Sequence, residues 1–456
     1  MNPETDKLPV RPAGQIAGAV RWPALATVPG GRLRGRVAGA IVRHAVRDLP
    51  LRMCLPDGTT LGAGGPADPE LTLHRPEAFY QRIGASGLIG FGESYQAGDW
   101  DADDLAGLLG VFAANVATLV PTSLQRLRRL HVPRRPRTEN ETADEARDNI
   151  AQHYDLSNEM FELFLDPTMT YSAALFDTPD PAPALGQGAS AAGAARLAGA
   201  LLRPDMNDGG AGLDLLRQAQ ERKIDRLLDL TNVGPGTRLL EIGSGWGELA
   251  RRAARRGAKV RTITLSERQL AYTRQQAELA GLADAVEAEL RDYRDVEGQY
   301  DAVLSVEMIE AVGREHWPTY FASLSRLLAP GGRVGLQAIT MPHDRMLATA
   351  RTQTWIVKYI FPGGLIPSMT AIRQNAARVG LQIRDDLSFG AHYARTLALW
   401  GERLVANASR LGTLGFDETF RRTWRLYLAY SEAGFASGYL DVHQLVLSRE
   451  PVATAA

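Results

Sequence analysis

Residues 239–250 read LLEIGSGWGELA, a short apolar segment that passes through a glycine-rich turn into a helical pattern. Glu241 lies inside the end of the apolar segment, and glycines follow at 243, 245 and 247. Glycines let a backbone approach a ligand closely, and the N–H groups at a helix N-terminus favour polar or anionic atoms. The stretch therefore predicts a strand, a turn and a helix that together hold a ligand.

The spacing of the glycines argues against a dinucleotide. The G-x-G-x-x-G fingerprint needs a glycine at its sixth position, where this sequence has Glu248. An acid for the ribose hydroxyls is also missing at the end of the next strand, which carries Thr264 and Ser266 instead. The pattern E-x-G-x-G-x-G instead resembles the first motif of class I methyltransferases, which bind S-adenosylmethionine (SAM).

The surrounding sequence alternates apolar segments with helical patterns, which favours a doubly wound α/β sheet with ligands at the carboxyl ends of its strands. After residue 340 the sequence looks mostly helical, with a last strand near 439–448. The other expected strands are 238–242, 259–264, 286–290, 301–305 and 333–339.

The remaining sequence suggests further parts. Residues 1–30 are rich in Pro, Gly and Ala and predict poor order, and 31–137 predict a small mixed N-terminal domain. A Pro- and charge-rich linker over 131–147 leads into a methyltransferase domain over 138–456. Within that domain, the low-complexity stretch 178–212 predicts a mobile loop.

Composition excludes several classes of protein. The chain has 456 residues, of which 45% are hydrophobic, and no apolar run approaches the ~18 residues that a membrane span needs. The N-terminus lacks the apolar core of a signal peptide, and Cys54 is the only cysteine, which excludes an internal disulfide and a multi-cysteine metal site. The histidines match no metal-ligand spacing, so we expect no metal and a cytoplasmic protein.

The near-neutral net charge of −1 hides a basic N-terminal part. Residues 1–137 hold 17 Lys and Arg against 12 Asp and Glu, and six arginines fall within 126–137. Such a cluster would attract an anionic lipid surface or a nucleic acid, although a solvated linker would have the same composition.

Six motifs in one order resemble the cyclopropane-fatty-acid synthase and mycolic-acid methyltransferase family. They are HYDLSNEMFELFLDPTMTYS, LLEIGSGWGELA, TLSERQ, VEMIEAVG, YIFPGGLIPS and HYARTLALW. The resemblance implies a class I SAM-dependent methyltransferase with a Rossmann-like sheet and helical lipid-binding additions. The N-terminal domain is similar to that of members acting on phospholipids, and the run from residue 337 to 368 is closest to actinobacterial enzymes linked to tuberculostearic acid.

The resemblance also implies which residues bind SAM. These residues come from four places in the sequence: the segment before the sheet, the glycine turn, the segment that contacts ribose and adenosine, and the segment that contacts adenine. The residues are Tyr171, Ser172, Glu241, Gly243, Ser244, Gly245, Gly247, Thr264, Leu265, Ser266, Gln269, Asp292 and Tyr293.

Members of the family hold a bicarbonate that accepts a proton from the alkylated chain. The resemblance places Glu310, Tyr393 and the backbone N–H of Ile339 at this site. Two of the family's ligands are missing, because Ala173 replaces a cysteine and Gln337 replaces a histidine. These departures put bicarbonate in doubt, and Glu310 would then hold an anion less well or act as the base itself.

The implied reaction is transfer of a SAM methyl group to the double bond of an oleoyl phospholipid, giving a 10-methylene branch that a separate reductase saturates. Two alternatives are cyclopropane ring formation on the same substrate and a catalytically silent SAM- and lipid-binding protein. Nucleic acid is not an expected partner, because no base-methylation motif is present. We expect association with the anionic inner face of the membrane, and we keep a homodimer open.

Overall fold

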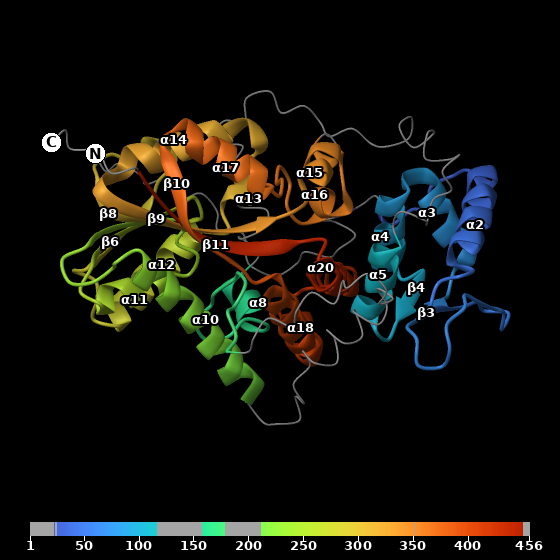
Figure 1. The fold of residues 1–456 in the computed structure, drawn as a ribbon. Coiled ribbons are helices and arrows are strands. Elements are labelled where there is room, and N and C mark those ends of the chain that lie inside the picture. Colours follow the sequence, from blue (N-terminus) through green and yellow to red (C-terminus); the bar gives the residue numbers. More distant parts are fainter. Residues whose placement is uncertain (1–21, 23–24, 116–156, 178–210, 351, 450–456) are drawn as a thin grey trace, which may run out of the picture.

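The computed structural model describes residues 22, 25–115, 157–177, 211–350 and 352–449. Its centre is a seven-stranded sheet with the order β10-β11-β9-β8-β5-β6-β7, shown in Figure 1. The five strands from β9 to β7 are parallel, while β11 runs antiparallel to both β9 and β10. The strands are β5 (Arg238–Ile242), β6 (Lys259–Thr264), β7 (Val286–Leu290), β8 (Tyr300–Val306), β9 (Leu328–Thr340), β10 (Leu381–Ser388) and β11 (Asp441–Arg449).

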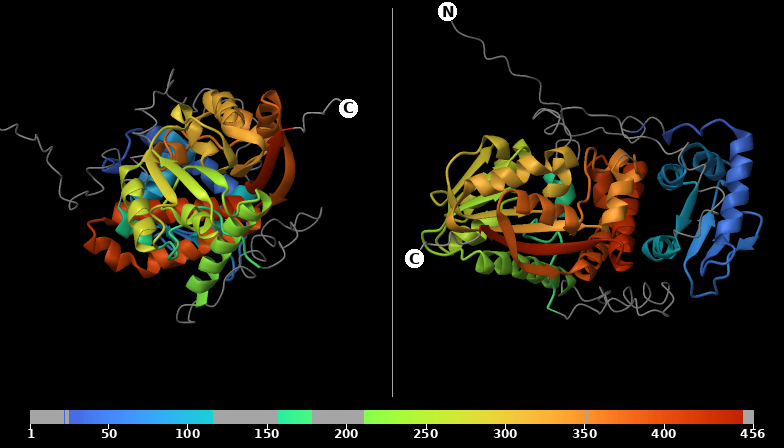
Figure 2. Two further views of the ribbon diagram at one scale, coloured as in Figure 1. Left: turned by 90° about the vertical axis from the view of Figure 1, so that its left-hand side faces the viewer. Right: turned by 45° about the horizontal axis from the view of Figure 1, so that its top comes forward.

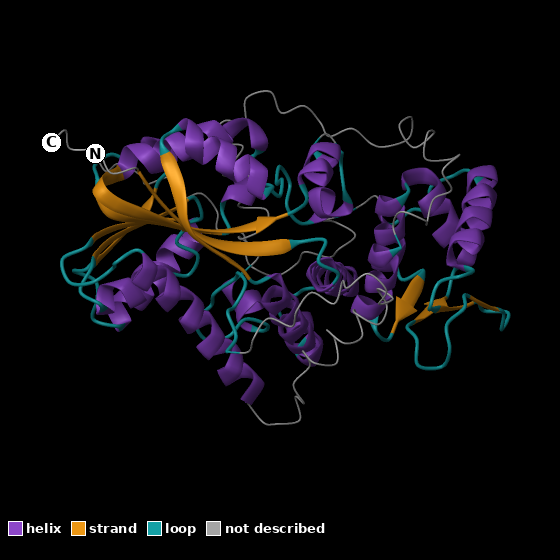
Figure 3. Cartoon of the chain, in the orientation of Figure 1, coloured by secondary structure: helices purple, strands orange, loops and turns teal. Residues whose placement is uncertain are grey.

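Helices cover both faces of this sheet, as Figure 3 shows. Because neighbouring side chains of a strand point to opposite faces, Val303 packs with α14 (Trp317–Leu327) and α17 (Met369–Arg378). Its neighbours Ala302 and Leu304 pack with α10 (Ala211–Leu230), α11 (Glu248–Arg255) and α12 (Glu267–Leu279). The sheet is therefore buried on both faces, which explains the continuous apolar runs of its central strands.

A third apolar cluster lies at the carboxyl ends of the parallel strands and is rich in aromatic side chains. It combines α18 (Gly390–Ala406) and α20 (Glu418–Ala436) with α8 (Asn158–Glu162) and most of the N-terminal region. The remaining short elements of this half are α13 (Ile309–Val312), α15 (His343–Thr349), α16 (Trp355–Tyr359), α19 (Ala408–Thr413) and the 3₁₀ turns η2 (Tyr293–Asp295) and η3 (Arg314–His316).

The N-terminal region forms a second, small sheet with the order β2-β1-β3-β4. Figure 2 shows this region, in blue, on the side of α20 away from the large sheet. Its helices α4 and α5 contact α20. Its elements are α2 (Arg32–Val46), β1 (Arg52–Cys54), β2 (Thr60–Leu61), β3 (Glu70–Leu73), α3 (Pro76–Ser86), α4 (Leu88–Gln96), β4 (Trp100–Ala102) and α5 (Leu105–Ala114).

Polar contacts join the N-terminal region to the larger half. The buried carboxylate of Glu93 pairs with Lys358 Nζ at 2.5 Å and accepts a hydrogen bond from the Tyr359 hydroxyl at 2.8 Å. Gln96 donates to Thr423 at 2.8 Å and accepts from the Trp355 indole at 2.9 Å. The two parts therefore share a core as well as an interface.

The doubly wound sheet confirms the fold class, and all six expected strands are present. β10 was not predicted, because its sequence LQIRDDLS has three consecutive charged residues that interrupt the apolar pattern at the edge of the sheet. Residues 211 and 212, expected in the mobile loop, are the first residues of α10. The rest of that loop, the linker and the arginine cluster at 126–137 lie outside the described residues.

The expectation of poor order for residues 1–30 misses two contacts. Trp22 stacks on Phe420 with 6.3 Å between ring centroids, and Leu25 is buried with its carbonyl accepting from Arg82. Residues 1–21 and 23–24 are outside the described part. Within the described part, no helix combines the length and the apolar character needed to cross a bilayer.

Candidate active site

The glycine turn lies at the carboxyl end of β5, where the sheet order reverses direction between β6 and β8. In open α/β sheets ligands bind at such a switch point. Gly245 has a φ of +49°, and a Cβ built there would meet nothing within 4 Å, so its backbone faces open space. At Gly247, φ is +83° and a Cβ would lie 2.7 Å from Thr273 Cγ2, so only glycine fits. The backbone of the turn is therefore accessible at Gly245 and tightly packed against Thr273 at Gly247.

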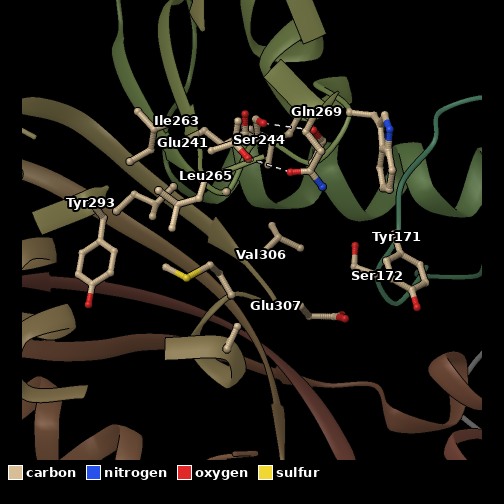
Figure 4. A pocket seen from close by; sticks show the side chains of 18 of the residues that line it. Tyr171, Ser172, Glu241, Ser244, Ile263, Leu265, Gln269, Tyr293, Val306 and Glu307 are labelled. Carbon is tan, nitrogen blue, oxygen red and sulfur yellow. Dashed lines mark hydrogen bonds between the residues drawn. The ribbon is translucent and has the colours of Figure 1, made fainter. Parts of the chain in front are cut away.

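A pocket opens at this turn, and most of the residues expected to bind SAM line it (Figure 4). The expected lining residues that the structure brings together are Tyr171, Ser172, Glu241, Gly243, Ser244, Gly245, Thr264, Leu265, Gln269, Asp292 and Tyr293. Gly247 and Ser266 are not part of the pocket wall. Ser266 caps α12 by accepting from Gln269 N at 3.2 Å, and Gly247 precedes the first residue of α11, so both support the wall from behind.

Hydrogen bonds hold the polar side chains of the wall in place. Glu241 accepts from Thr262 Oγ1 at 2.6 Å, and burial raises the pKa of the Glu241 carboxyl to about 8. Thr264 Oγ1 donates to Gln269 Oε1 at 2.9 Å. Asp292 accepts from the backbone of Arg294 at 2.8 Å and pairs with its guanidinium. The wall therefore presents three fixed acceptor groups around the glycine turn.

Glu307, which sequence reasoning passed over, also lines the pocket. It directly follows β8, and its N–H donates to the carbonyl of Gln337 on β9 at 2.8 Å. Its carboxylate accepts from Ala173 N at 2.9 Å, from Gln337 Nε2 at 2.7 Å and from the Tyr393 hydroxyl at 2.7 Å. Figure 4 shows this side chain extending toward Tyr171 and Ser172.

The set of residues predicted around Glu310 is therefore divided between two carboxylates. Tyr393 and Gln337 both donate to the carboxylate of Glu307. Of the predicted set, only the N–H of Ile339 donates to Glu310, whose Oε1 accepts this hydrogen bond. Glu310 is not part of the pocket wall, and its Oε2 has no hydrogen-bond partner among the described residues. Burial, together with the nearby Glu307, raises the pKa of Glu310 to about 8. The structure therefore shows the expected contact of Ile339 with Glu310 but places Tyr393 and Gln337 on Glu307, and a catalytic role for this set of residues stays a prediction.

A buried lysine is the second feature that the sequence did not reveal. Lys223, on α10, is fully buried and donates to Ser172 Oγ at 2.6 Å at the pocket wall. Burial lowers the pKa of Lys223 to about 8, while the carboxylates of Glu307 and Asp166 act to raise it. The only sequence signal was a charged residue within the helical pattern of α10, which is typical of a solvated face.

On the pocket wall near Glu307 lies Tyr171, and further aromatic rings pack against it. Tyr171 lines the pocket, lies 5.2 Å from the ring of Trp400 and shares a hydrogen bond of 2.7 Å with the Tyr427 hydroxyl. Tyr393 in turn packs on Phe435 with 4.5 Å between centroids. Aromatic faces stabilise positive charge, so this wall suits a cationic ligand or intermediate.

These residues fit SAM on two structural grounds. The open space at Gly245 admits a ligand against the backbone, and the carboxyl groups of Glu241, Asp292 and Glu307 offer acceptor oxygens to a molecule that carries ammonium and sulfonium charges. When bound, SAM supplies an electrophilic methyl group. In the described part of the chain, no three His, Cys, Asp or Glu side chains are grouped as metal ligands would be.

Comparison with known proteins agrees with this geometry. The family described as mycolic acid cyclopropane synthetase matches residues 141–445. Tuberculostearic acid methyltransferase UfaA1 of Mycobacterium tuberculosis is 51% identical over 436 residues, which are 94% of this chain and 96% of that protein. Cyclopropane-fatty-acyl-phospholipid synthase of Escherichia coli is 30% identical over 86% of this chain and 90% of its own length.

Solved structures extend the comparison to the fold. The cyclopropane synthase MmaA2 of Mycobacterium tuberculosis has a TM-score of 0.55 at 30% identity, covering 66% of this chain and 98% of that one. The mycolic acid cyclopropane synthase CmaA1, complexed with SAH and CTAB, has a TM-score of 0.54 at 29% identity, covering 66% and 97%. The chain therefore belongs to the mycolic acid cyclopropane synthetase family and has the fold of its SAM-dependent methyltransferases.

Proposed function

We propose that the protein transfers a methyl group from SAM to the double bond of an oleoyl chain in a phospholipid, giving a 10-methylene branch. The observation that carries this proposal is the pocket itself, which joins the glycine turn to Tyr171 and to the carboxylate of Glu307. The similarity to tuberculostearic acid methyltransferase UfaA1 over almost the whole chain supports it. We also propose that a separate reductase saturates the methylene product and that the protein forms a homodimer.

In the proposed reaction the π electrons of the alkene form a bond from C10 to the methyl carbon, and the methyl–sulfur electron pair stays on sulfur. The positive charge is left at C9. A hydride shift from C10 to C9 moves the charge to C10, and loss of a proton from the new methyl group gives the methylene. Alignment of alkene and donor in a site that excludes water supplies much of the rate enhancement.

For SAM binding we propose roles that follow the position of each residue on the pocket wall. Gly243, Ser244 and Gly245 offer the backbone of the turn, and Glu241, Thr264 and Gln269 offer acceptors for hydroxyl or ammonium groups. Asp292 and Tyr293 lie at the end of β7 for the adenine, with Leu265 on the neighbouring strand end. Tyr171 and Ser172 would lie near the reacting methyl group.

The deciding experiment is incubation with SAM and dioleoyl phospholipid, followed by NMR of the released fatty acid. Exocyclic methylene protons would support the proposal, and cyclopropane protons would show ring formation. Mass alone does not distinguish these isomers. A protein that binds SAM with normal affinity and produces neither compound would be the silent SAM- and lipid-binding protein.

We further propose that the N-terminal region contacts the anionic inner face of the membrane. Helix α2 exposes Leu33 and Val37, which are 75% and 54% exposed, beside the exposed Arg32, Arg34 and Arg36. Apolar and basic side chains on one helix favour an anionic lipid interface. Leu33→Ser with Val37→Ser should weaken sedimentation with phosphatidylglycerol vesicles, as should Ser at Arg128 and Arg129. Equal sedimentation of all variants at low salt would refute the proposal.

A further inference from the structure

Glu307 has a backbone conformation that side chains rarely adopt. Its φ is +49°, and among the described residues only Met169 and Asn232 are other non-glycine residues with positive φ. Met169 also lines the pocket, whereas Asn232 is exposed in the turn after α10. Strained backbone of this kind tends to gather at functional sites. The left-handed turn at Glu307 directs its carboxylate into the pocket, where Ala173, Gln337 and Tyr393 meet it.

The hydrogen bonds of the Glu307 side chain all run toward its carboxylate. Arg226, paired with Asp385, donates to Gln444 Oε1 at 3.0 Å, and Gln444 Nε2 donates to Gln337 Oε1 at 3.0 Å. This contact orients the Gln337 amide so that its NH₂ group donates to Glu307. A chain of donors that starts at a cation and ends on a carboxylate favours the ionised form of that carboxylate.

The titratable groups facing Glu307 act in the same direction. Burial and the adjacent Glu307 raise the pKa of Tyr393 well above its ordinary value, so the phenol stays protonated and donates. The charge of Lys223 stabilises the Glu307 anion, and the charge of Glu307 in turn raises the pKa of Glu310 on α13. Burial outweighs these contacts and still raises the pKa of Glu307, which makes its anion a stronger base than a carboxylate in water.

We propose that Glu307 is the proton acceptor of the reaction, and that its carboxylate fills the place where a separate anion such as bicarbonate would otherwise be needed. This inference rests on the proposed function. The methyl C–H bond of the C10 cation breaks, its electron pair forms the C10 methylene double bond, and the proton goes to Glu307. Tyr393 and Gln337 are positioning residues that hold the acceptor, and the neutral acid returns its proton to solvent before the next turnover.

Glu307→Gly is the sharpest test, because it removes the carboxylate, keeps the donors and leaves an anion-sized space. Turnover should fall by roughly 10²–10⁴-fold, the usual contribution of general acid–base catalysis. Affinity for SAM, measured by calorimetry, should change little. Bicarbonate or formate should restore part of the turnover of Glu307→Gly, while the wild type should be fully active in bicarbonate-depleted buffer.

A readout without substrates distinguishes this inference from the proposed function. Bicarbonate and formate should raise the melting temperature of Glu307→Gly and leave that of the wild type unchanged. Asn232→Gly is the matched control, because it makes the same replacement at a positive φ far from the pocket. Should Glu307→Gly fail to fold, Glu307→Gln keeps the shape and should lose turnover to a similar extent without rescue by anions.

Three results would overturn the inference. The first is a folded Glu307→Gly or Glu307→Gln with turnover close to that of the wild type in depleted buffer. The second is a wild-type enzyme that stops when bicarbonate is removed and recovers when it returns. The third is a melting temperature of Glu307→Gly that does not respond to either anion. A wild type that binds SAM and never methylates oleoyl phospholipid would instead refute the proposed function, and the melting experiment would still report whether Glu307 fills an anion site.

Discussion

Replacing Glu310 by Gln should change how the stability of the protein depends on pH. Glu310 is partly buried, accepts one hydrogen bond from Ile339 and has an Oε2 atom without a partner among the described residues. Burial and the charge of Glu307 raise its pKa from 4.5 to about 8. A raised pKa in the folded state means that protonation stabilises the fold. This stabilisation is complete below about pH 4.5 and is lost progressively as the pH rises to about 8.

The size of the effect follows from the two pKa values. At about 1.4 kcal/mol per pKa unit, the rise from 4.5 to about 8 gives an upper bound of roughly 5 kcal/mol. Solvent relaxation around a partly exposed side chain reduces this, so we expect about 2 kcal/mol. The free energy of unfolding of the wild type should fall by that amount relative to Glu310→Gln between about pH 5 and pH 8.5. Gln removes the titration and keeps the shape.

Urea unfolding followed by tryptophan fluorescence at both pH values measures this difference. Glu315→Gln is a suitable control, because Glu315 is exposed and its replacement should leave the pH dependence unchanged. If wild type and Glu310→Gln differ by the same amount at both pH values, Glu310 is ionised in the folded protein. The assignment of the anion to Glu307 would then lose its electrostatic support.

Three further predictions test the pocket and its frame. Gly245→Val should abolish SAM binding measured by calorimetry, while the circular dichroism spectrum stays native. The reason is that a side chain at φ +49° costs about 1–2 kcal/mol and would occupy the space kept open at the turn. Unchanged SAM affinity in a folded variant would show that the turn is not part of the SAM site. Lys223→Met should move the acid limb of the turnover profile to higher pH, because loss of the cation raises the pKa of Glu307 further, and a shift to lower pH would contradict this. Glu93→Ala should lower the free energy of unfolding by about 2 kcal/mol, because it leaves Lys358 and Tyr359 unpaired at a partly exposed interface, and a loss within error would show that the interface is held by apolar contacts alone.

The sequence predicts the fold well where local pattern and burial coincide. The central strands β5, β6 and β8 are buried on both sides, so their apolar runs and glycine punctuation reveal them. β10 escapes because one side of it is exposed, and its charged residues include Asp385 and Asp386, which pair with Arg226 and His443. Such pairs join elements far apart in the chain, and a single sequence does not show them.

The candidate site also has one part that the sequence predicts, the glycine turn, and one part that it does not predict, the surroundings of Glu307. The cradle around Gly243 and Gly245 is local, because its residues lie within one strand–turn–helix unit, and the motif located it. The carboxylate site is assembled from the segment at Ala173, the strand at Gln337 and the helix at Tyr393. The motif VEMIEAVG offers two acids three residues apart, and the sequence alone does not decide which one those donors meet.

The backbone conformation decides which of the two acids meets the donors, and the energies involved favour a functional role for Glu307. A left-handed conformation at Glu307 costs roughly 1–2 kcal/mol, which a glycine would avoid. Hydrogen bonds to a charged group contribute about 1.5–3 kcal/mol each, and Glu307 accepts three. These bonds offset the strain and hold the carboxylate rigidly, but only because the donors are already arranged around an anion. Without the carboxylate, those donors would need another anion or water, so the strained residue and its donors form one unit. A base built into the chain in this way is present at every turnover, whereas a bound anion would have to be captured from solution.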